Sequence, residues 1–311
     1  MSSERNNVTP KPSEWNEEDL KAAILRSGYL LEQRVETVLL AAGYEVHASR
    51  RVADNETGKT REMDLLAEMR EAQTIEQANE RPAVGASLII ECVNNRLPLV
   101  FFEKPVTWTE SFQLRTLLGC PLNVPDKPGS SGFYLLEDQA GVSWRTTIKH
   151  WATQYCCFEE KRGKDRHFEA SQHNDHHVTF DKLVAEAERC ADGVMNEGLI
   201  QAGWMGGWLT LIRPVLVLQG HLFAANVQGE AVSLAARDHI HYLRRGVVSE
   251  RKVAWVVDIV TEAGLPCYLS GTAATLDKVR TYCTEQRDKV QEAFGSDSTR
   301  RLSLMSRGAV R

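Results

Sequence analysis

The amino-acid sequence predicts an α/β fold in which helices flank a central mixed β-sheet. Apolar residues recur at helical spacing in 17–42, and three segments with strand character, 44–52, 61–69 and 88–93, follow this helix. The segments 88–93 (LIIECV) and 253–260 (VAWVVDIV) are short apolar runs rich in β-branched residues. Such runs are typical of strands that are buried on both faces, and helices on either side of a sheet provide that burial.

The first predicted helix occupies residues 17–42. Its apolar residues recur every three or four positions from Leu20 to Leu39. Gly28 interrupts the pattern, so the segment can divide into two helices there. Gly43 follows the last periodic residues and is a typical helix stop.

Three predicted strands come next, joined by polar connections. Residues 44–52 alternate between apolar and polar side chains, as a half-buried strand does. The sequence DNETGKT, 54–60, consists of residues that tolerate tight turns. The strands 61–69 and 88–93 follow, separated by a polar, glutamate-rich connection.

The rest of the chain continues to alternate helices and strands. We expect a helix within 101–119, a fourth strand at 132–138, less regular chain at 146–181, a helix at 181–197, two strands joined as a hairpin at Gln219 and Gly220, a strand at 253–260 and a last helix at 274–294.

Composition sets limits on the class of protein. The 311 residues are enough for one large domain or two ordinary ones, and the hydrophobic content of 42% and charged content of 25% are ordinary for a globular protein. The formal net charge of −5 gives no global sign of a polyanionic partner. A surface for nucleic acid would therefore be a local patch on an acidic protein.

The cysteines and the N-terminus predict a cytoplasmic protein. Seven cysteines, an odd number without CxxC spacing, favour reduced thiols over a disulfide framework. The first residues are polar and lack the apolar core of a secretory signal. No apolar run approaches the roughly 20 residues that a membrane-spanning helix needs, so we expect no membrane association.

The strand at 88–93 carries an unexpected carboxylate, Glu91. A buried, unpaired carboxylate is costly or becomes protonated, so Glu91 should meet a cation or lie where the strand opens into a site. Asp64 lies on the preceding predicted strand, and if the two strands are neighbours both carboxylates can converge on one face. An ion such as Mg²⁺ would relieve their repulsion and serve phosphodiester hydrolysis. The alternative is pairing with an arginine, for instance Arg50, Arg51 or Arg61.

The segments 30–46 (LLEQRVETVLLAAGYEV), 61–68 (REMDLLAE) and 88–95 (LIIECVNN) resemble the PD-(D/E)xK nuclease superfamily. In that family a helical glutamate precedes a hairpin that bears the aspartate, and the next strand carries Glu-x-Lys. The matching residues are Glu32, Asp64 and Glu91. The resemblance covers about residues 25–105.

This resemblance implies a restriction-endonuclease-like core, with a central mixed sheet flanked by helices, at residues 16–145. Residues 146–295 would complete or enlarge that core. We expect 1–15 to be a disordered N-terminal segment and 296–311 a flexible basic tail.

One position departs from the family pattern. Val93 stands where the family places its lysine, which is usually assigned to orienting or activating the attacking water. A valine cannot do this, and losing such a group typically costs about 10²–10⁴-fold in rate. Either a lysine reaches in from elsewhere, with Lys104 and Lys59 the nearest along the chain, or the domain binds nucleic acid without cutting it.

The resemblance thus predicts a Mg²⁺- or Mn²⁺-dependent endonuclease that cleaves DNA, in the setting of bacterial defence or repair. Asp64 and Glu91 would hold the metal, Glu32 would assist directly or through water, and Lys104 is the candidate for the missing ammonium. The alternative is a catalytically degenerate subunit that binds nucleic acid or a protein partner. Either protein could also assemble with a second copy of itself.

Two further clusters have simpler interpretations. The histidine-rich segment 167–177 is interpreted as a solvated loop, since a structural zinc site usually shows tighter paired spacing. The segment 239–246, HIHYLRRG, is interpreted as a surface helix. The basic runs 161–166 and 298–311 could neutralise phosphates, although solvated loops and tails commonly have such composition.

Overall fold

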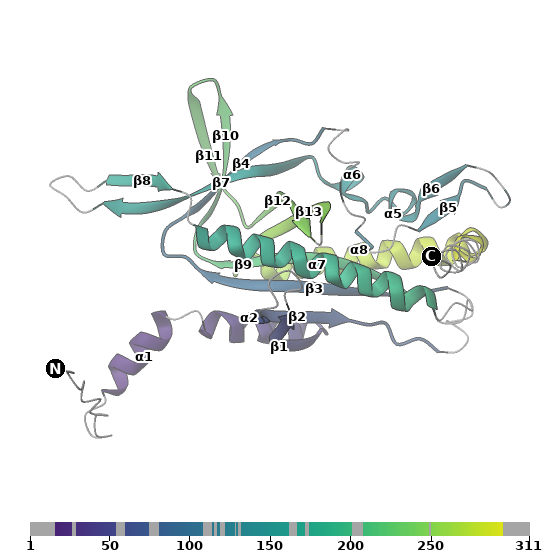
Figure 1. Cartoon of the computed structure of the whole chain (residues 1–311), viewed down its shortest axis with the longest axis horizontal. Helices are drawn as coiled ribbons and strands as arrows, with labels where there is room; N and C mark the ends of the chain where they lie inside the picture. Colours follow the sequence, from purple (N-terminus) through teal and green to yellow (C-terminus); the bar gives the residue numbers. More distant parts are fainter. Residues whose placement is uncertain are drawn as a thin grey trace.

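An eleven-stranded mixed sheet, with strand order β1-β2-β3-β9-β13-β12-β7-β4-β10-β11 and β8 paired to β7, organises the chain (Figure 1). The structure is a computed structural model. It describes residues 16–26, 29–53, 60–74, 81–107, 114, 117–118, 122–127, 129, 132–161, 167–171, 174–200, 208–248 and 250–294. Strands from both halves of the sequence share this one sheet. The fold is therefore α/β with a large mixed sheet flanked by helices.

The N-terminal part follows the order that the sequence predicts. Its elements are α1 (Glu17–Arg26), α2 (Tyr29–Ala41), β1 (Glu45–Ala53), β2 (Thr60–Met69) and β3 (Ala83–Asn94). Gly43 has a φ of 85°, the left-handed conformation that commonly ends a helix. The expected break at Gly28, the turn at 54–59 and the terminal segments 1–15 and 296–311 lie outside the described residues.

The helix α7 (Asn174–Ile200) connects the early strands to the second half of the sheet. β1, β2 and β3 pair antiparallel, and β9 (Trp208–Gln219), which follows α7, pairs parallel with β3. In Figure 1, α7 runs along the sheet beside β9 and β3. The chain order is thus helix, three antiparallel strands, an inserted segment, helix and parallel strand.

The other elements enlarge the sheet or pack beside it. They are β4 (Leu99–Pro105), β5 (Asn123–Pro125), β6 (Phe133–Leu135), α5 (Leu136–Gln139), α6 (Trp144–Thr147), β7 (His150–Lys161), β8 (His167–Ser171), β10 (Leu222–Gln228), β11 (Ala231–Ala236), β12 (His239–Val248), β13 (Arg251–Thr261) and α8 (Leu265–Glu285).

Two hydrophobic clusters sandwich the central strands. Ile90 of β3 packs in a cluster with residues of α2 and α8, whereas its neighbour Ile89 packs in a second cluster with Phe180 and Leu183 of α7. Successive strand residues point to opposite faces, so the two clusters lie on the two faces of the sheet. The burial of β3 on both faces is confirmed.

Several local predictions are wrong. Residues 239–246 belong to β12 instead of a surface helix, and the segment expected to be irregular contains β7 and β8. Of the segment 101–119, where a helix was expected, residues 101–105 belong to β4 and most of the remainder lies outside the described residues. Within the histidine-rich segment, residues 167–171 form β8 and residues 174–177 belong to the first turn of α7, in place of the expected loop. Alternating apolar side chains produce these strands, and tertiary contacts decide where local periodicity is ambiguous.

The strand predicted at 132–138 is confirmed over part of its length, whereas the predicted hairpin is wrong. Residues 133–135 form the short strand β6, which pairs with β5 outside the main sheet. β9 and β10 do not pair with each other, because β9 lies between β3 and β13 while β10 lies between β4 and β11. The chain does turn at Gly220, where φ is 153° and a Cβ atom would lie 2.5 Å from the carbonyl oxygen of Asn95.

The helices in the described part of the chain include none with the length and apolar character needed to cross a membrane.

We predict that Gly220→Ala destabilises the fold by about 1–3 kcal/mol, because the added methyl group meets the Asn95 carbonyl and φ is unfavourable. Denaturant unfolding measures this change. Gly246→Ala is the control, since a Cβ at Gly246 meets no atom within 4 Å. Equal unfolding midpoints for the two variants would contradict the prediction.

Candidate active site

Asp64 and Glu91 occupy facing positions on β2 and β3. The antiparallel register pairs Leu65 with Ile90, so Asp64 and Glu91 are the next residues on each strand. Each carboxylate accepts a hydrogen bond from a main-chain N–H group of the facing strand. The Cys92 N–H donates to Asp64 Oδ2 at 2.8 Å, and the Asp64 N–H donates to Glu91 Oε1 at 3.3 Å. The convergence of these two residues at one place is as the sequence predicts.

A lysine from α7 reaches this pair. Lys182 Nζ lies 2.6 Å from Glu91 Oε1 and donates to the main-chain oxygen of Glu62 at 2.5 Å. The side chains of Lys182 and Glu91 are only 17% and 7% exposed, so the ion pair is shielded from water. Phe180 and Leu183 on either side of Lys182 are fully buried and fix this turn of the helix on the sheet.

The cluster carries more negative charge than Lys182 balances. Burial, reinforced by the charge of Asp64, raises the pKa of Glu91 from 4.5 to about 7 against the opposing effect of Lys182. Burial also raises the pKa of Asp64, although the Cys92 hydrogen bond and Lys182 oppose it. The pKa of Glu32 on α2 is raised by burial and then by the charges of Asp64 and Glu62. A further cation would relieve this strain.

Each of the two central carboxylates has one oxygen available for such a cation. Asp64 Oδ1 and Glu91 Oε2 accept no hydrogen bond from any residue that the structure describes. Carboxylate oxygens without protein donors are suitable ligands for a hard ion such as Mg²⁺. The residues present therefore fit a divalent cation.

Glu32 is a neighbour of this pair rather than a third ligand beside it. The charge of Asp64 contributes to the raised pKa of Glu32, so α2 places Glu32 near Asp64. Among the described residues, however, Glu32, Asp64 and Glu91 do not form a group of three ligand atoms within 4.8 Å of one another. The residues that do are His239, His241 and Asp258. Glu32 can thus act on a bound ion through an intervening water.

The arginine alternative finds no support among the described side chains. Arg51 is exposed and forms no ion pair with Asp64 or Glu91. The side chains of Arg50 and Arg61 lie outside the described set. The cation that does contact Glu91 is an ammonium.

Lys104 is not that ammonium, so this prediction is wrong. It lies near the end of β4, opposite Trp151 of β7, and four strands separate β4 from β3 in the sheet order. Lys59 lies outside the described residues. Lys182 was not predicted, because the candidate lysines were those near Glu91 along the chain. Its only local signal is a lysine between Phe180 and Leu183 in a predicted helix.

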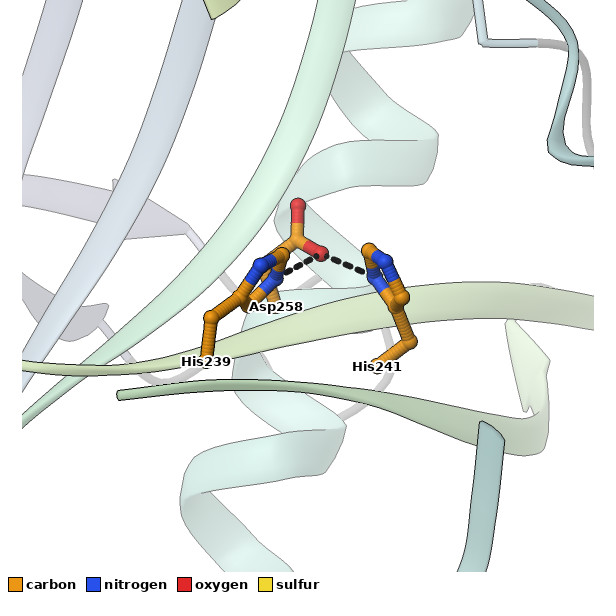
Figure 2. A group of neighbouring side chains, drawn as sticks. All are labelled: His239, His241 and Asp258. Atoms are coloured by element: carbon orange, nitrogen blue, oxygen red, sulfur yellow. Dashed lines mark hydrogen bonds and ion pairs between the residues drawn. The ribbon is translucent and has the colours of Figure 1, made fainter. Parts of the chain in front are cut away.

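A second polar cluster surrounds Asp258 of β13. Asp258 Oδ1 accepts hydrogen bonds from His239 Nε2 at 3.0 Å and His241 Nδ1 at 2.7 Å (Figure 2). Its Oδ2 accepts from Arg213 Nη1 at 3.0 Å and Tyr268 Oη at 2.7 Å. This cluster was not predicted, because 239–246 was interpreted as a helix, whereas a strand directs both histidines to one face.

The charges of this second cluster are balanced internally. Burial alone would raise the pKa of Asp258, but the Arg213 guanidinium and the two histidine hydrogen bonds hold it well below its usual range. Burial lowers the pKa of His241, against its bond to Asp258. Strand alternation places Asp258 with Val256 and Val260 in the cluster that includes α8, so it lies on the opposite face from Glu91.

Comparison with known proteins finds no relative. The chain matches no protein-family profile, no curated protein and no solved structure.

We predict that Glu91→Gln changes the pH dependence of stability. Because the pKa of folded Glu91 is raised from 4.5 to about 7, the folded state holds a proton that the unfolded state loses, and wild-type stability falls as the pH rises through this window. Glu91→Gln has no carboxyl group to titrate, so its free energy of unfolding does not fall in this way. The difference in free energy of unfolding between the variant and wild type should therefore shift in favour of the variant by up to about 3 kcal/mol between pH 4.5 and pH 8.

Urea unfolding at a series of pH values measures this difference. Glu17→Gln in the exposed helix α1 controls for the loss of one negative charge. A stability difference between Glu91→Gln and wild type that stays constant with pH would contradict the account.

Proposed function

We propose that this chain is a divalent-metal-dependent nuclease that hydrolyses DNA phosphodiester bonds at the cluster of Asp64, Glu91 and Lys182. The observation that carries this proposal is the 2.6 Å contact between Lys182 Nζ and Glu91 Oε1 beside Asp64. Two carboxylates and an ammonium are the side chains that the PD-(D/E)xK resemblance requires. Lys182 supplies the group that Val93 cannot.

The arrangement of elements supports the same proposal. Glu32 lies on a helix before the β1–β2 hairpin, Asp64 on that hairpin and Glu91 on the next strand, in the order that the resemblance implies. The lysine comes from a different element, as it does in some members of the superfamily. A restriction-endonuclease-like core would then consist of α2, β1, β2, β3, α7 and β9.

The side chains have distinct roles in this proposal. Asp64 Oδ1 and Glu91 Oε2 would hold Mg²⁺ or Mn²⁺, which when bound supplies a Lewis acid for the phosphate and for water activation. Lys182 has three N–H donors, of which two bond to Glu91 and to the Glu62 main chain. The third can donate to a phosphate oxygen or orient the attacking water. Glu91 fixes the ammonium for this task.

Lys182 weakens the main argument for the alternative, a catalytically degenerate subunit that binds without cleaving. It rested on the absence of a lysine two residues after Glu91, where Val93 stands. Lys182 restores a positive charge at the carboxylate itself. DNA as the substrate comes from the family resemblance alone.

We predict that the full-length protein nicks or degrades plasmid DNA with Mg²⁺ or Mn²⁺ and does not do so with a chelator. Asp64→Asn should abolish cleavage, because it removes a metal ligand. Lys182→Met should reduce the rate by about 10²–10⁴-fold, because it removes the group that positions water. Gel analysis of initial nicking rates measures both effects.

Lys104→Met is the matched control and should retain wild-type activity, since four strands separate β4 from β3. Circular dichroism verifies that each variant is folded. Cleavage that depends on Lys104 and not on Lys182 would overturn the assignment. Wild-type protein that shifts DNA in a gel but does not cleave it in the presence of any metal ion would establish the binding-only alternative.

A further inference from the structure

The second cluster has the geometry of a metal site. His239 and His241 are two residues apart on β12, so their side chains share a face, and Asp258 of β13 pairs directly with His241. Figure 2 shows both imidazoles directed at the same oxygen of Asp258. The ligand atoms of the three residues all lie within 4.8 Å of one another.

We propose that His239, His241 and Asp258 bind a divalent transition metal, with Zn²⁺ and Co²⁺ as the test ions. Two imidazole nitrogens and one carboxylate oxygen favour such ions over Mg²⁺ or Ca²⁺, which prefer oxygen ligands. This site lies on the opposite face of the sheet from Glu91 and does not depend on the proposed nuclease function.

The ligand atoms already lie at separations close to those of a metal site. The two nitrogens now lie 3.0 and 2.7 Å from Asp258 Oδ1 as hydrogen-bond donors, and no two of the three ligand atoms are more than 4.8 Å apart. Ligands about 2.0 Å from a tetrahedral ion lie roughly 3.3 Å apart, so each nitrogen would move a few tenths of an ångström away from Oδ1 on binding.

The imidazole protons that now point at Asp258 can move to the outer ring nitrogens. Each neutral imidazole frees its inner nitrogen by moving its proton to the outer one, His239 Nδ1 or His241 Nε2, without net proton loss. The two side chains are 32% and 25% exposed, which gives solvent access for this exchange.

The residues around Asp258 orient it for this role. Arg213 and Tyr268 both bond to Oδ2 and leave Oδ1 for the ion, as outer partners of metal-binding carboxylates do. The Arg213 guanidinium also lies over the ring of Trp144, 4.9 Å from its centroid, which holds the arginine in place.

Arg213 also indicates what else the ion would bind. A divalent ion beside Asp258 and Arg213 leaves two excess positive charges, which favours an anion such as hydroxide or phosphate as a further ligand. Arg213 Nε is buried and has no hydrogen-bond partner among the described residues. It is a donor available to such an anion.

Titration of metal-free, full-length protein with Co²⁺ tests the proposal. The titrations use the Asp64→Asn background, so that the first cluster contributes little binding. We expect one equivalent of Co²⁺ to produce visible absorption bands of a nitrogen-ligated ion, and Zn²⁺ to displace it. His239→Gln and His241→Gln should each remove the bands, because each lacks one ligand.

Two further variants distinguish a ligand from a merely structural residue. Tyr268→Phe keeps all three ligands but removes an outer hydrogen bond, and it should weaken Co²⁺ binding by about 10–100-fold. His47→Gln removes an exposed histidine beside Glu45 and Glu68 and should leave binding unchanged.

Absence of Co²⁺ and Zn²⁺ binding in the folded Asp64→Asn protein would overturn the proposal and leave the cluster as a closed hydrogen-bond network. Equal binding by His241→Gln and its parent would also overturn it. Plasmid cleavage does not enter either readout, so failure of the nuclease proposal is distinguishable from failure of this one.

Discussion

The charge of Glu91 is the constraint on which the centre of the structure depends. A carboxylate in the interior must be protonated, paired or bound to a cation, and breaking a buried pair leaves an uncompensated charge. Glu91 can lie near the end of β3, which is buried on both faces, because α7 packs along the sheet and places Lys182 Nζ 2.6 Å from Glu91 Oε1. The same packing of α7 that encloses the core therefore assembles the proposed catalytic group.

The sheet carries two polar clusters that differ in charge balance. Asp258 has a guanidinium, a phenol and two imidazoles as hydrogen-bond donors, so its charge is satisfied by the protein. Asp64 and Glu91 share a single ammonium, and burial raises the pKa of both. An added cation would therefore stabilise the carboxylate pair more than the Asp258 cluster. The proposed nuclease site is accordingly the carboxylate pair, and the proposed metal site at Asp258 is separate from it.

Sequence patterns predict what is local in this protein. The helix before Gly43, the strands β1 to β3 and the meeting of Asp64 with Glu91 follow from periodicity and from the short connections between neighbours. Lys182 could not be found in this way, because the contact joins distant parts of the chain and depends on the path of α7. The hairpin expected at Gly220 was wrong for a similar reason: a turn was recognised, but the sheet order that separates β9 from β10 is set by tertiary pairing. The histidines of β12 were missed once a helix was assumed.

The most direct test of the central claim is a crystal structure of the protein soaked in Mn²⁺, with the ion located by its anomalous scattering. The account predicts a peak within bonding distance of Asp64 Oδ1 and Glu91 Oε2, with Lys182 Nζ still beside Glu91 Oε1. A structure at saturating Mn²⁺ with no peak between these carboxylates, or with the Lys182 ammonium between them in place of an ion, would contradict it.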